Sequence, residues 1–250
     1  MKDYQGFKNN GNWYKGNLHS HTTVSDGKMT PEQSVEVYKE HGYNFLALSE
    51  HDIYTDYRKQ YNTDNFIMIP AIEASAILYQ EEGSSKRLEI HHLHGILGTS
   101  EMQKNAKAPL FTHMEHVPPQ KHYGTWRGRE ISQEIADMLR DRGCVVTYNH
   151  PIWSRVTEEE FIYTEGVQAL EIFNYNTVLE SNTGYDVTYW DRMLRMGKKI
   201  NGFASDDNHN EGLFEDSCGG WICVQAPELT HDAIIQNFLD GNYYSSAGPV

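Results

Sequence analysis

The run FLALSEHD, residues 45–52, begins with apolar side chains and ends with Glu50, His51 and Asp52. A histidine or carboxylate likewise ends three later apolar runs, IMIPAIE at 67–73, CVVTYNHP at 144–151 and INGFASDDNH at 200–209. Short apolar runs of this kind predict buried strands, and amphipathic segments such as 132–142 predict helices between them. Strands that alternate with helices predict βα units and a mainly parallel sheet.

The histidines and acids at these strand ends would meet if the strands form a barrel. The carboxyl ends of the strands in a (β/α) barrel make one rim, where active sites are built. A single group has an ordinary explanation, since Asp52 could cap a helix and residues 25–27, Ser-Asp-Gly, could be a plain turn. With the strand candidate 17–21, which carries His19 and His21, five strand ends each carry His, Asp or Glu, and a metal site explains them better. Mixed imidazole and carboxylate ligands are typical of zinc, iron or manganese.

The 250-residue chain is expected to fold as one domain over 1–250, with an insertion at 99–129 and a C-terminal strand and helix within 210–250. Lys and Arg number 21 against 35 Asp and Glu, which gives a net charge of −14. This balance argues against strong nucleic-acid binding and against an anionic membrane surface as partners. A small phosphorylated substrate remains compatible if metal ions supply the positive charge.

The chain shows no targeting signal by its sequence. Its apolar runs stay short of the ~20 residues of a membrane span, and residues 1–10 lack the apolar segment of a signal peptide. A cytoplasmic location is therefore expected. Cys144, Cys218 and Cys223 form no CxxC pair, so they predict neither a disulfide framework nor a cysteine metal site.

Two early motifs, NLHSHTTVSDG at 17–27 and ALSEHD at 47–52, resemble the opening of the PHP (polymerase and histidinol phosphatase) family. Glu73, the histidines of 91–94, NHP at 149–151 and SDDNH at 205–209 match later motifs of this family in order. The resemblance covers roughly residues 16–210. It implies a distorted (β/α)7 TIM-like barrel of the PHP type with two or three divalent metal ions, zinc, manganese or iron.

The resemblance also implies three groups of metal ligands. His19, His21, Glu73 and Asp207 would hold the first metal. Glu73 would bridge to the second, which would also take His150 and one histidine of residues 91–94. Asp26, His51 and His209 would hold the third.

His91, His92 and His94 are the candidates for the remaining ligand of the second metal. Side chains alternate along a strand, so His92 and His94 share a face while His91 points the other way. His94 precedes GILG at 95–98, which resembles the histidine and short apolar strand of the family. We therefore predict His94 as the ligand, and expect His92 to contact substrate or to support the ligands.

Three further residues have less certain roles in the predicted site. The doublet Asp206-Asp207 leaves two candidate ligands, of which the one-residue gap to His209 favours Asp207. Asp206 and Asn149 are then candidates for orienting the ligands. Arg155 could hold a substrate phosphate with two hydrogen bonds, or could be an ordinary surface arginine.

The implied activity is that of a metal-dependent phosphoesterase. A metal-activated water would cleave a phosphoester bond of a small phosphorylated metabolite or nucleotide, without a Ser or Cys nucleophile. The same metals polarise carbonyl groups, so hydrolysis of an amide, carbamate or ester bond is the alternative.

Overall fold

The computed structural model describes Phe7, residues 11–210 and residues 215–248. Its strands form a five-stranded sheet, a six-stranded sheet and a two-stranded ribbon. In spatial order the five-stranded sheet contains β13 (Tyr243–Ser246), β12 (Trp221–Ala226), β1 (Asn12–Asn17), β2 (Phe45–Leu46) and β4 (Ile67–Met68). The six-stranded sheet contains β11 (Asn201–Ser205), β10 (Val167–Asn174), β9 (Cys144–Tyr148), β6 (Arg87–Leu97), β5 (Ala71–Tyr79) and β8 (Gln120–Tyr123). The ribbon pairs β3 (Ile53–Tyr54) with β7 (Glu115–His116).

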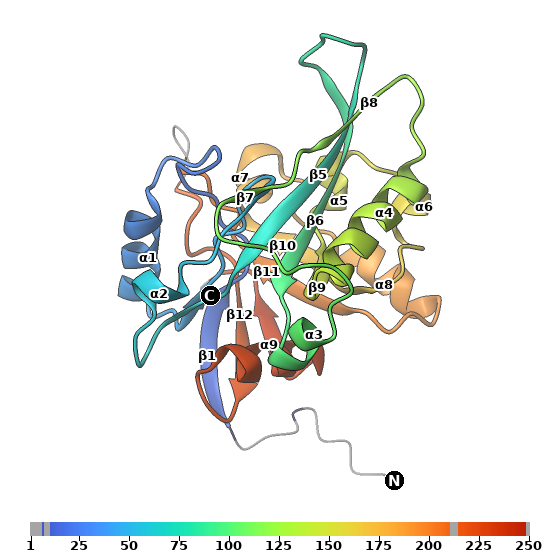
Figure 1. Cartoon of the computed structure of the whole chain (residues 1–250). Helices are drawn as coiled ribbons and strands as arrows, with labels where there is room; N and C mark the ends of the chain where they lie inside the picture. The colour runs from blue at the N-terminus through green and yellow to red at the C-terminus, as the bar shows by residue number, and fades with distance from the viewer. Residues whose placement is uncertain (1–6, 8–10, 211–214, 249–250) are drawn as a thin grey trace.

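Helices lie on both sides of the central strands β5 and β6, with α1 and α2 at the left of Figure 1 and α4, α6 and α8 at the right. The helices are α1 (Pro31–Glu40), α2 (Arg58–Tyr61), α3 (Ser100–Lys104), α4 (Gly128–Asp141), α5 (Pro151–Ser154), α6 (Glu158–Phe161), α7 (Tyr175–Ser181), α8 (Val187–Arg195) and α9 (His231–Leu239). The predicted mixed α/β class is confirmed.

The strand directions depart from the predicted mainly parallel pattern at β12, which is antiparallel to β1 and β13, and at β6. β1, β2 and β4 run parallel to one another, as do β9, β10 and β11. β6, however, is antiparallel to both of its neighbours, β5 and β9. β5 and β6 are consecutive strands joined by the short segment 80–86, and such a connection can only reverse the chain, because parallel strands need a crossover of a dozen or more residues.

The two large sheets meet at the carboxyl ends of β1 and β2. The amide of Asp207 donates to the carbonyl of His19 at 2.9 Å, and the amide of His21 donates to that of Asn208 at 3.1 Å. On the other side, the amide of Glu73 donates to the carbonyl of Glu50 at 3.1 Å. The described strands therefore adjoin at two seams, although they do not pair as one continuous seven-stranded ladder.

One buried apolar cluster contains side chains from both large sheets. Leu18 lies directly before His19 and belongs to this cluster, as do Ile96 and Val145 from the six-stranded sheet and Ile222 and Val224 from β12. All five are nearly inaccessible to solvent. The polar residues that follow these strands are therefore held above a packed apolar interior.

Helix α1 forms where its sequence predicts. The hydroxyl of Thr30 accepts the amide of Gln33 at 3.2 Å, and the side chain of Gln33 accepts the amide of Thr30 at 2.9 Å, which is the expected capping box. Gly42 follows the helix with φ of +74°, a left-handed conformation that suits glycine at a helix end.

Residues 99–129 are more regular than the insertion expected from the sequence. They include α3, β7 and β8, and β8 extends the six-stranded sheet by pairing in parallel with β5. Arg142, just after α4, anchors the segment through Glu115 at 2.5 Å and the carbonyl of Pro109 at 2.8 Å, with its guanidinium 3.5 Å from the ring of Phe111. The segment therefore flanks the sheet.

Among the described residues, no helix is both long and apolar enough to cross a membrane. The cytoplasmic location expected from the sequence stays a prediction.

Candidate metal centre

The polar strand ends converge into one continuous cluster of possible metal ligands. Its groups, in each of which the ligand atoms lie within 4.8 Å of one another, are His21, Asp26, His51 and His209; His19, His21, Glu73 and Asp207; His51, Glu73 and His92; and His19, His150 and Glu171. The structure thus brings together eight of the nine predicted ligands, all except His94.

The first group is buried, and only Asp207 keeps a small exposed fraction. Nε2 of His19 lies 3.1 Å from Oε1 of Glu73 and 3.0 Å from Oδ1 of Asp207, and Nε2 of His21 lies 2.9 Å from the same Asp207 oxygen. Burial alone would lower the pKa of His19, but the charges of Asp207 and Glu73 outweigh it and raise this pKa well above its usual value. Strong negative charge therefore converges on these two imidazoles, as a cation site requires.

Glu73 is shared between the first group and a second one. Its Oε2 lies 2.9 Å from Nδ1 of His51, and its Oε1 lies 3.3 Å from Nε2 of His150 and 3.4 Å from Nδ1 of His92. The side-chain amide of Asn149 donates to Oε1 of Glu73 at 2.7 Å, which fits the orienting role predicted for Asn149. A carboxylate with donors on both sides can bridge two cations.

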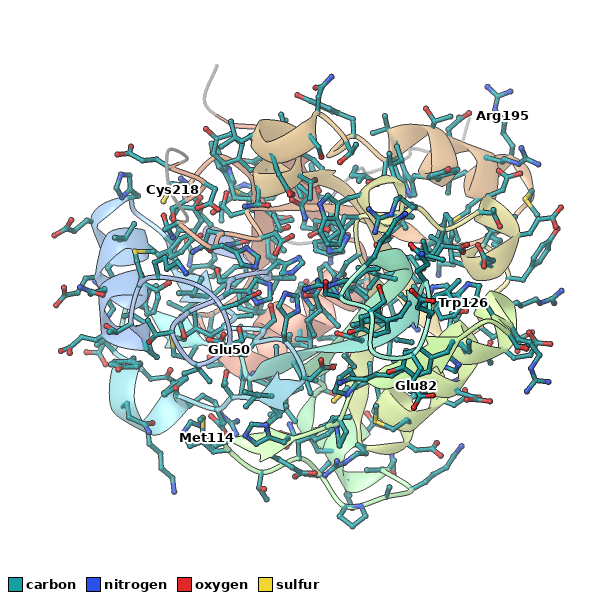
Figure 2. The ribbon with its side chains drawn as sticks, turned by 90° about the horizontal axis from the view of Figure 1, so that it is seen from above. Glu50, Glu82, Met114, Trp126, Arg195 and Cys218 are labelled. Carbon is teal, nitrogen blue, oxygen red and sulfur yellow. The ribbon has the colours of Figure 1, made fainter. Side chains whose placement is uncertain are left out.

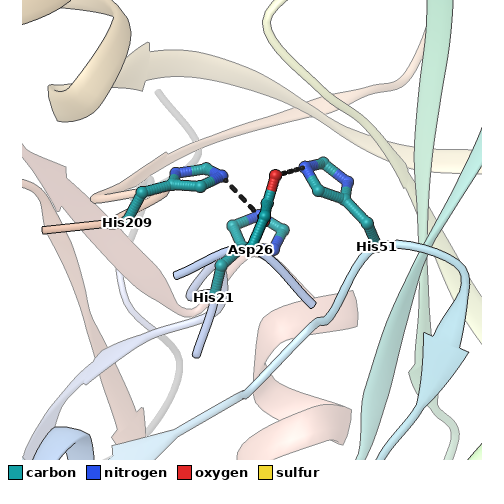
Figure 3. Close-up of side chains that lie close together, drawn as sticks. All are labelled: His21, Asp26, His51 and His209. Atoms are coloured by element: carbon teal, nitrogen blue, oxygen red, sulfur yellow. Dashed lines mark ion pairs between the residues drawn. The ribbon is translucent and has the colours of Figure 1, made fainter. Parts of the chain in front are cut away.

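The third group lies closest to solvent (Figure 3). Asp26 stands between His209, whose Nε2 is 3.3 Å from Oδ1, and His51, whose Nε2 is 3.6 Å from Oδ2. The ring of His21 stacks on those of His51 and His209 at centroid distances of 4.2 and 4.4 Å. The Asp26 side chain is 55% exposed, whereas those of Glu73 and His19 are fully buried. Solvent therefore reaches the cluster from the Asp26 side.

In the third group, the pKa shifts favour an ionised Asp26 beside a protonated His209. Burial lowers the pKa of His209, but the hydrogen bond to Asp26 and the charge of Asp207 raise it to about 10. Burial raises the pKa of Asp26, but the hydrogen bond to His209 and the neighbouring imidazole of His51 hold it below its usual value. Asp26 is therefore ionised at neutral pH and available to a cation.

His92, rather than the predicted His94, faces the second group. His94 has its Nδ1 3.3 Å from the hydroxyl of Thr147, and its ring packs edge-on against that of His19 with centroids 4.2 Å apart. No group of possible ligands among the described residues includes it. His92 and His94 do share a face, as predicted, and His91 points away, with Nδ1 2.5 Å from the hydroxyl of Tyr148 and its ring stacked on Trp126.

Glu171 is a component of the cluster that sequence reasoning missed. Its Oε1 lies 2.8 Å from Nδ1 of His19 and accepts the hydroxyl of Ser205. Its Oε2 accepts the amide of His150 at 3.1 Å and the side-chain amide of Asn174 at 3.0 Å. The available signal is a carboxylate within the apolar run ALEIF at 169–173, since a buried charge of this kind needs partners.

Glu50 is a second missed carboxylate, and it supports the loop that carries Asp26. It is fully buried and lies in the interior of the molecule in Figure 2, whereas Arg195 projects from the edge. Glu50 accepts the amide of Thr22 at 3.0 Å and the hydroxyl of Ser25 at 2.5 Å. In the sequence Glu50 directly precedes His51, and this position does not distinguish a supporting carboxylate from a metal ligand.

The Asp206-Asp207 doublet divides into two roles. Asp207 faces His19 and His21, as predicted. Asp206 turns the other way, where its carboxylate accepts the amides of Cys218, Gly219 and Gly220 at 2.6 to 2.8 Å. It also accepts the Tyr38 hydroxyl at 2.6 Å. Asp206 therefore anchors the chain that carries Asp207 to the start of β12.

Arg155, the predicted phosphate-binding residue, is engaged elsewhere. Its Nε donates to the carbonyl of Leu88 at 2.8 Å and its Nη2 to that of Arg87 at 3.0 Å, at the start of β6. These two bonds use the edge of the guanidinium formed by Nε and Nη2. Arg155 therefore fixes the start of β6, and its contact with a substrate phosphate stays a prediction.

The donors of the cluster fit divalent cations. Nδ1 of His21 is buried without a hydrogen-bond partner among the described residues, whereas Oε2 of Glu73 and Oδ1 of Asp207 face imidazole nitrogens at 2.9 to 3.4 Å. Each unsatisfied buried polar atom costs about 1–3 kcal/mol, and more if it is charged. Imidazole nitrogens combined with carboxylate oxygens suit zinc, iron or manganese.

Comparison with solved structures places this arrangement among known folds. A two-domain protein from Bacteroides vulgatus, which contains a predicted PHP-like metal-dependent phosphoesterase, matches with a TM-score of 0.57 and 15% identity over 99% of this chain and 67% of that chain. A proposed metal-dependent phosphoesterase from Bifidobacterium adolescentis matches with a TM-score of 0.51 and 14% identity over 90% and 95% of the two chains. The chain has the PHP-type fold. The predicted resemblance is thus confirmed at the level of the fold.

Another solved structure that is similar to this chain carries a different name. An amidohydrolase from Chromobacterium violaceum with bound sulfate and no metal matches with a TM-score of 0.51 and 13% identity, over 92% of this chain and 97% of that chain. By sequence, neither a protein-family model nor a curated protein matches this chain.

The exclusion of nucleic acid by net charge is wrong. Endonuclease Q, in complex with a 27-mer duplex substrate that has an abasic lesion at the active site, matches with a TM-score of 0.49 and 13% identity over 94% of this chain and 58% of that chain. A net charge of −14 is a property of the whole chain, whereas binding of a phosphate depends on the local charge where cations are held. The charge therefore excludes no nucleic-acid partner.

Proposed function

We propose that the chain is a metal-dependent phosphoesterase whose cations are held by this cluster. The observation that carries the proposal is the position of Glu73, whose two oxygens both face imidazoles: Oε1 faces His19, His92 and His150, and Oε2 faces His21 and His51. The chemistry that such cations supply is polarisation of a phosphoryl oxygen and activation of a water molecule. The likeness to metal-dependent phosphoesterases supports this choice.

The proposed ligands follow the three predicted groups with one change. His92 replaces His94 beside Glu73 and His150, because its Nδ1 is directed at Glu73. His19, His21, Glu73 and Asp207 form the first group, and Asp26, His51 and His209 the third. Zinc, manganese and iron are the candidate metals, and two or three ions the candidate number.

The other side chains orient these ligands. Glu171 accepts a hydrogen bond from Nδ1 of His19, which leaves Nε2 of that ring to bind a cation. Asn174 donates to Glu171 and, at 2.9 Å, to Oδ2 of Asp207, so that the other oxygen, Oδ1, faces His19 and His21. The cluster is thereby preorganised before substrate binds.

We also propose that the two large sheets act as one distorted barrel within a single unit spanning 1–250. The seams between residues 19–21 and 207–208 and between 50–52 and 73 support this, since they join the sheets where the ligands lie. The closure would account for how ligands from five strand ends reach one point.

The experiment compares phosphomonoesters, phosphodiesters, carboxylate esters and amides as substrates of protein loaded with manganese, zinc or iron. The proposal expects turnover of a phosphoester that is lost after chelation and in Glu73→Gln, while Glu134→Gln, an exposed acid on α4, keeps wild-type activity. The amidohydrolase likeness favours the second candidate, hydrolysis of an amide, carbamate or ester bond. Metal-dependent turnover of esters or amides without phosphoester cleavage would establish that alternative.

A further inference from the structure

Trp153 covers two histidines of the proposed second group. Its ring centroid lies 5.1 Å from that of His150, nearly perpendicular, and 6.0 Å from that of His92, with the planes 28° apart. His150 is 1% exposed and His92 3%, whereas Trp153 is half-buried. The indole therefore lies on the solvent side of these two ligands.

The position of Trp153 is fixed by three contacts. Its Nε1 donates to Oε2 of Glu180, on α7, at 2.7 Å. Within α5, the amide of Ile152 donates to Asp186 at 3.1 Å and the amide of Ser154 to the carbonyl of His150 at 3.1 Å. The indole N–H is thus already used, and what Trp153 can offer a bound molecule is its aromatic ring.

The backbone conformation of His150 couples the position of the Trp153 indole to that of the His150 imidazole. His150 has φ of +25°, a conformation that few residues other than glycine adopt, and Pro151 follows it directly. Strained residues of this kind persist only where their surroundings hold them. Because Trp153 lies in α5, the short helix that directly follows His150, the contacts that hold His150 also set the position of the indole above it.

We propose that Trp153 is a specificity-determining residue that stacks on a planar ring in the leaving group of the substrate. The substrate class is then a phosphoester that carries an aromatic or heterocyclic group, as a nucleotide does. This inference rests on the proposed function, since the phosphoryl group must lie at the cations beside His92 and His150. Aromatic rings stack on bases with about 1–3 kcal/mol per base, which is enough to select substrates.

The test uses adenosine 5′-monophosphate and ribose 5-phosphate, which share the scissile bond and differ in the base. Wild-type protein should have the higher kcat/KM for adenosine 5′-monophosphate. Trp153→Leu should lower that value about 5- to 150-fold, which corresponds to the stacking energy, and should change the value for ribose 5-phosphate less than about threefold. Trp153→Phe, which keeps a ring, should retain most of the preference. Trp13→Leu, an exposed tryptophan on β1, is the matched control and should change neither value.

Calorimetric dissociation constants of the same two compounds, measured with the same variants, keep the inference separate from the proposed function. If no phosphoester is cleaved, the proposed function fails, yet tighter binding of adenosine 5′-monophosphate that disappears in Trp153→Leu would still support the stacking role. Equal losses for both compounds in Trp153→Leu would show that the indole only packs the ligands. Equal affinity of wild-type protein for both compounds would likewise overturn the inference.

Discussion

Oε1 of Glu171 lies 2.8 Å from Nδ1 of His19, with both side chains completely buried. This contact fixes which nitrogen of His19 carries a proton, and so which one is directed at Glu73 and Asp207. The same carboxylate holds the amide of His150 at 3.1 Å. One side chain that binds no cation in the proposed scheme thus orients ligands of both neighbouring groups.

Glu171→Gln should weaken metal binding without unfolding the protein. The amide is close in size to the carboxylate but carries no charge, so it holds the His19 proton less strongly, and changes of this kind typically cost 10- to 100-fold in metal affinity. Competition against a chelator of known affinity measures the change, with Glu134→Gln as the control. Unaltered affinity would show that Glu171 has only a packing role.

Substitution of the three histidines of β6 should separate their roles. His92→Ala should lose one equivalent of metal and nearly all activity, because it removes a donor beside Glu73. His94→Ala should keep the metal but lower the melting temperature, since it removes the contact with Thr147 and opens a cavity beside His19. His91→Ala should keep both metal and activity. Elemental analysis of the purified variants decides, and loss of metal from His94→Ala alone would restore the assignment made from the sequence.

Removal of the metals should lower the free energy of unfolding. Three carboxylates, Asp26, Glu73 and Asp207, converge on one site and repel one another when no cation lies between them. Because metals bind only the folded cluster, saturation at 100 to 1,000 times Kd should add about 3–4 kcal/mol. Thermal unfolding with and without chelator measures the effect, and an identical melting temperature in both conditions would argue against a multinuclear site.

Asp186 should make the stability of the metal-free protein fall as pH rises. Burial, opposed by the amide of Ile152 and by His150, raises its pKa to about 7. Between about pH 4 and pH 7 the unfolded chain has lost this proton while the folded chain keeps it, so the free energy of unfolding decreases with pH across that window. Asp186→Asn removes this titration, and its stability relative to wild type should therefore increase from pH 4 to pH 7 and then level off. Denaturant titrations at several pH values, with chelator present, measure the difference. A difference that stays constant with pH would contradict the shift.

Several of the predicted ligands that the structure brings together follow buried strands, whereas Glu73, predicted at a strand end, is the third residue of β5. His51 and His150 stand where an apolar run ends, so position in the sequence places them at a common edge. Glu171 escaped this reasoning because it lies inside a strand, where nothing in the linear pattern shows that a buried carboxylate faces inward.

Strand direction accounts for the position of His92, rather than His94, beside Glu73. His94 is predicted because GILG at 95–98 follows it, a pattern that carries no information on strand direction. β6 runs antiparallel to β5 and β9, so along β6 the residue with the lower number, His92, lies nearer the rim. The two residues share a face in either direction, and alternation alone could not distinguish them.

The amide of Asp206 donates to the side chain of Asn17 at 3.1 Å across 189 residues of sequence, and the Asp206 carboxylate is bound in turn by the start of β12. The ligands His19 and Asp207 are therefore adjacent only after nearly the whole chain has been brought together. Contacts of such separation form slowly, because the loop must close before they contribute any free energy. On a ribosome, the cluster cannot assemble until the segment around Gly220 has emerged, so uptake of a cation by this protein would mark the completion of its folding rather than its onset.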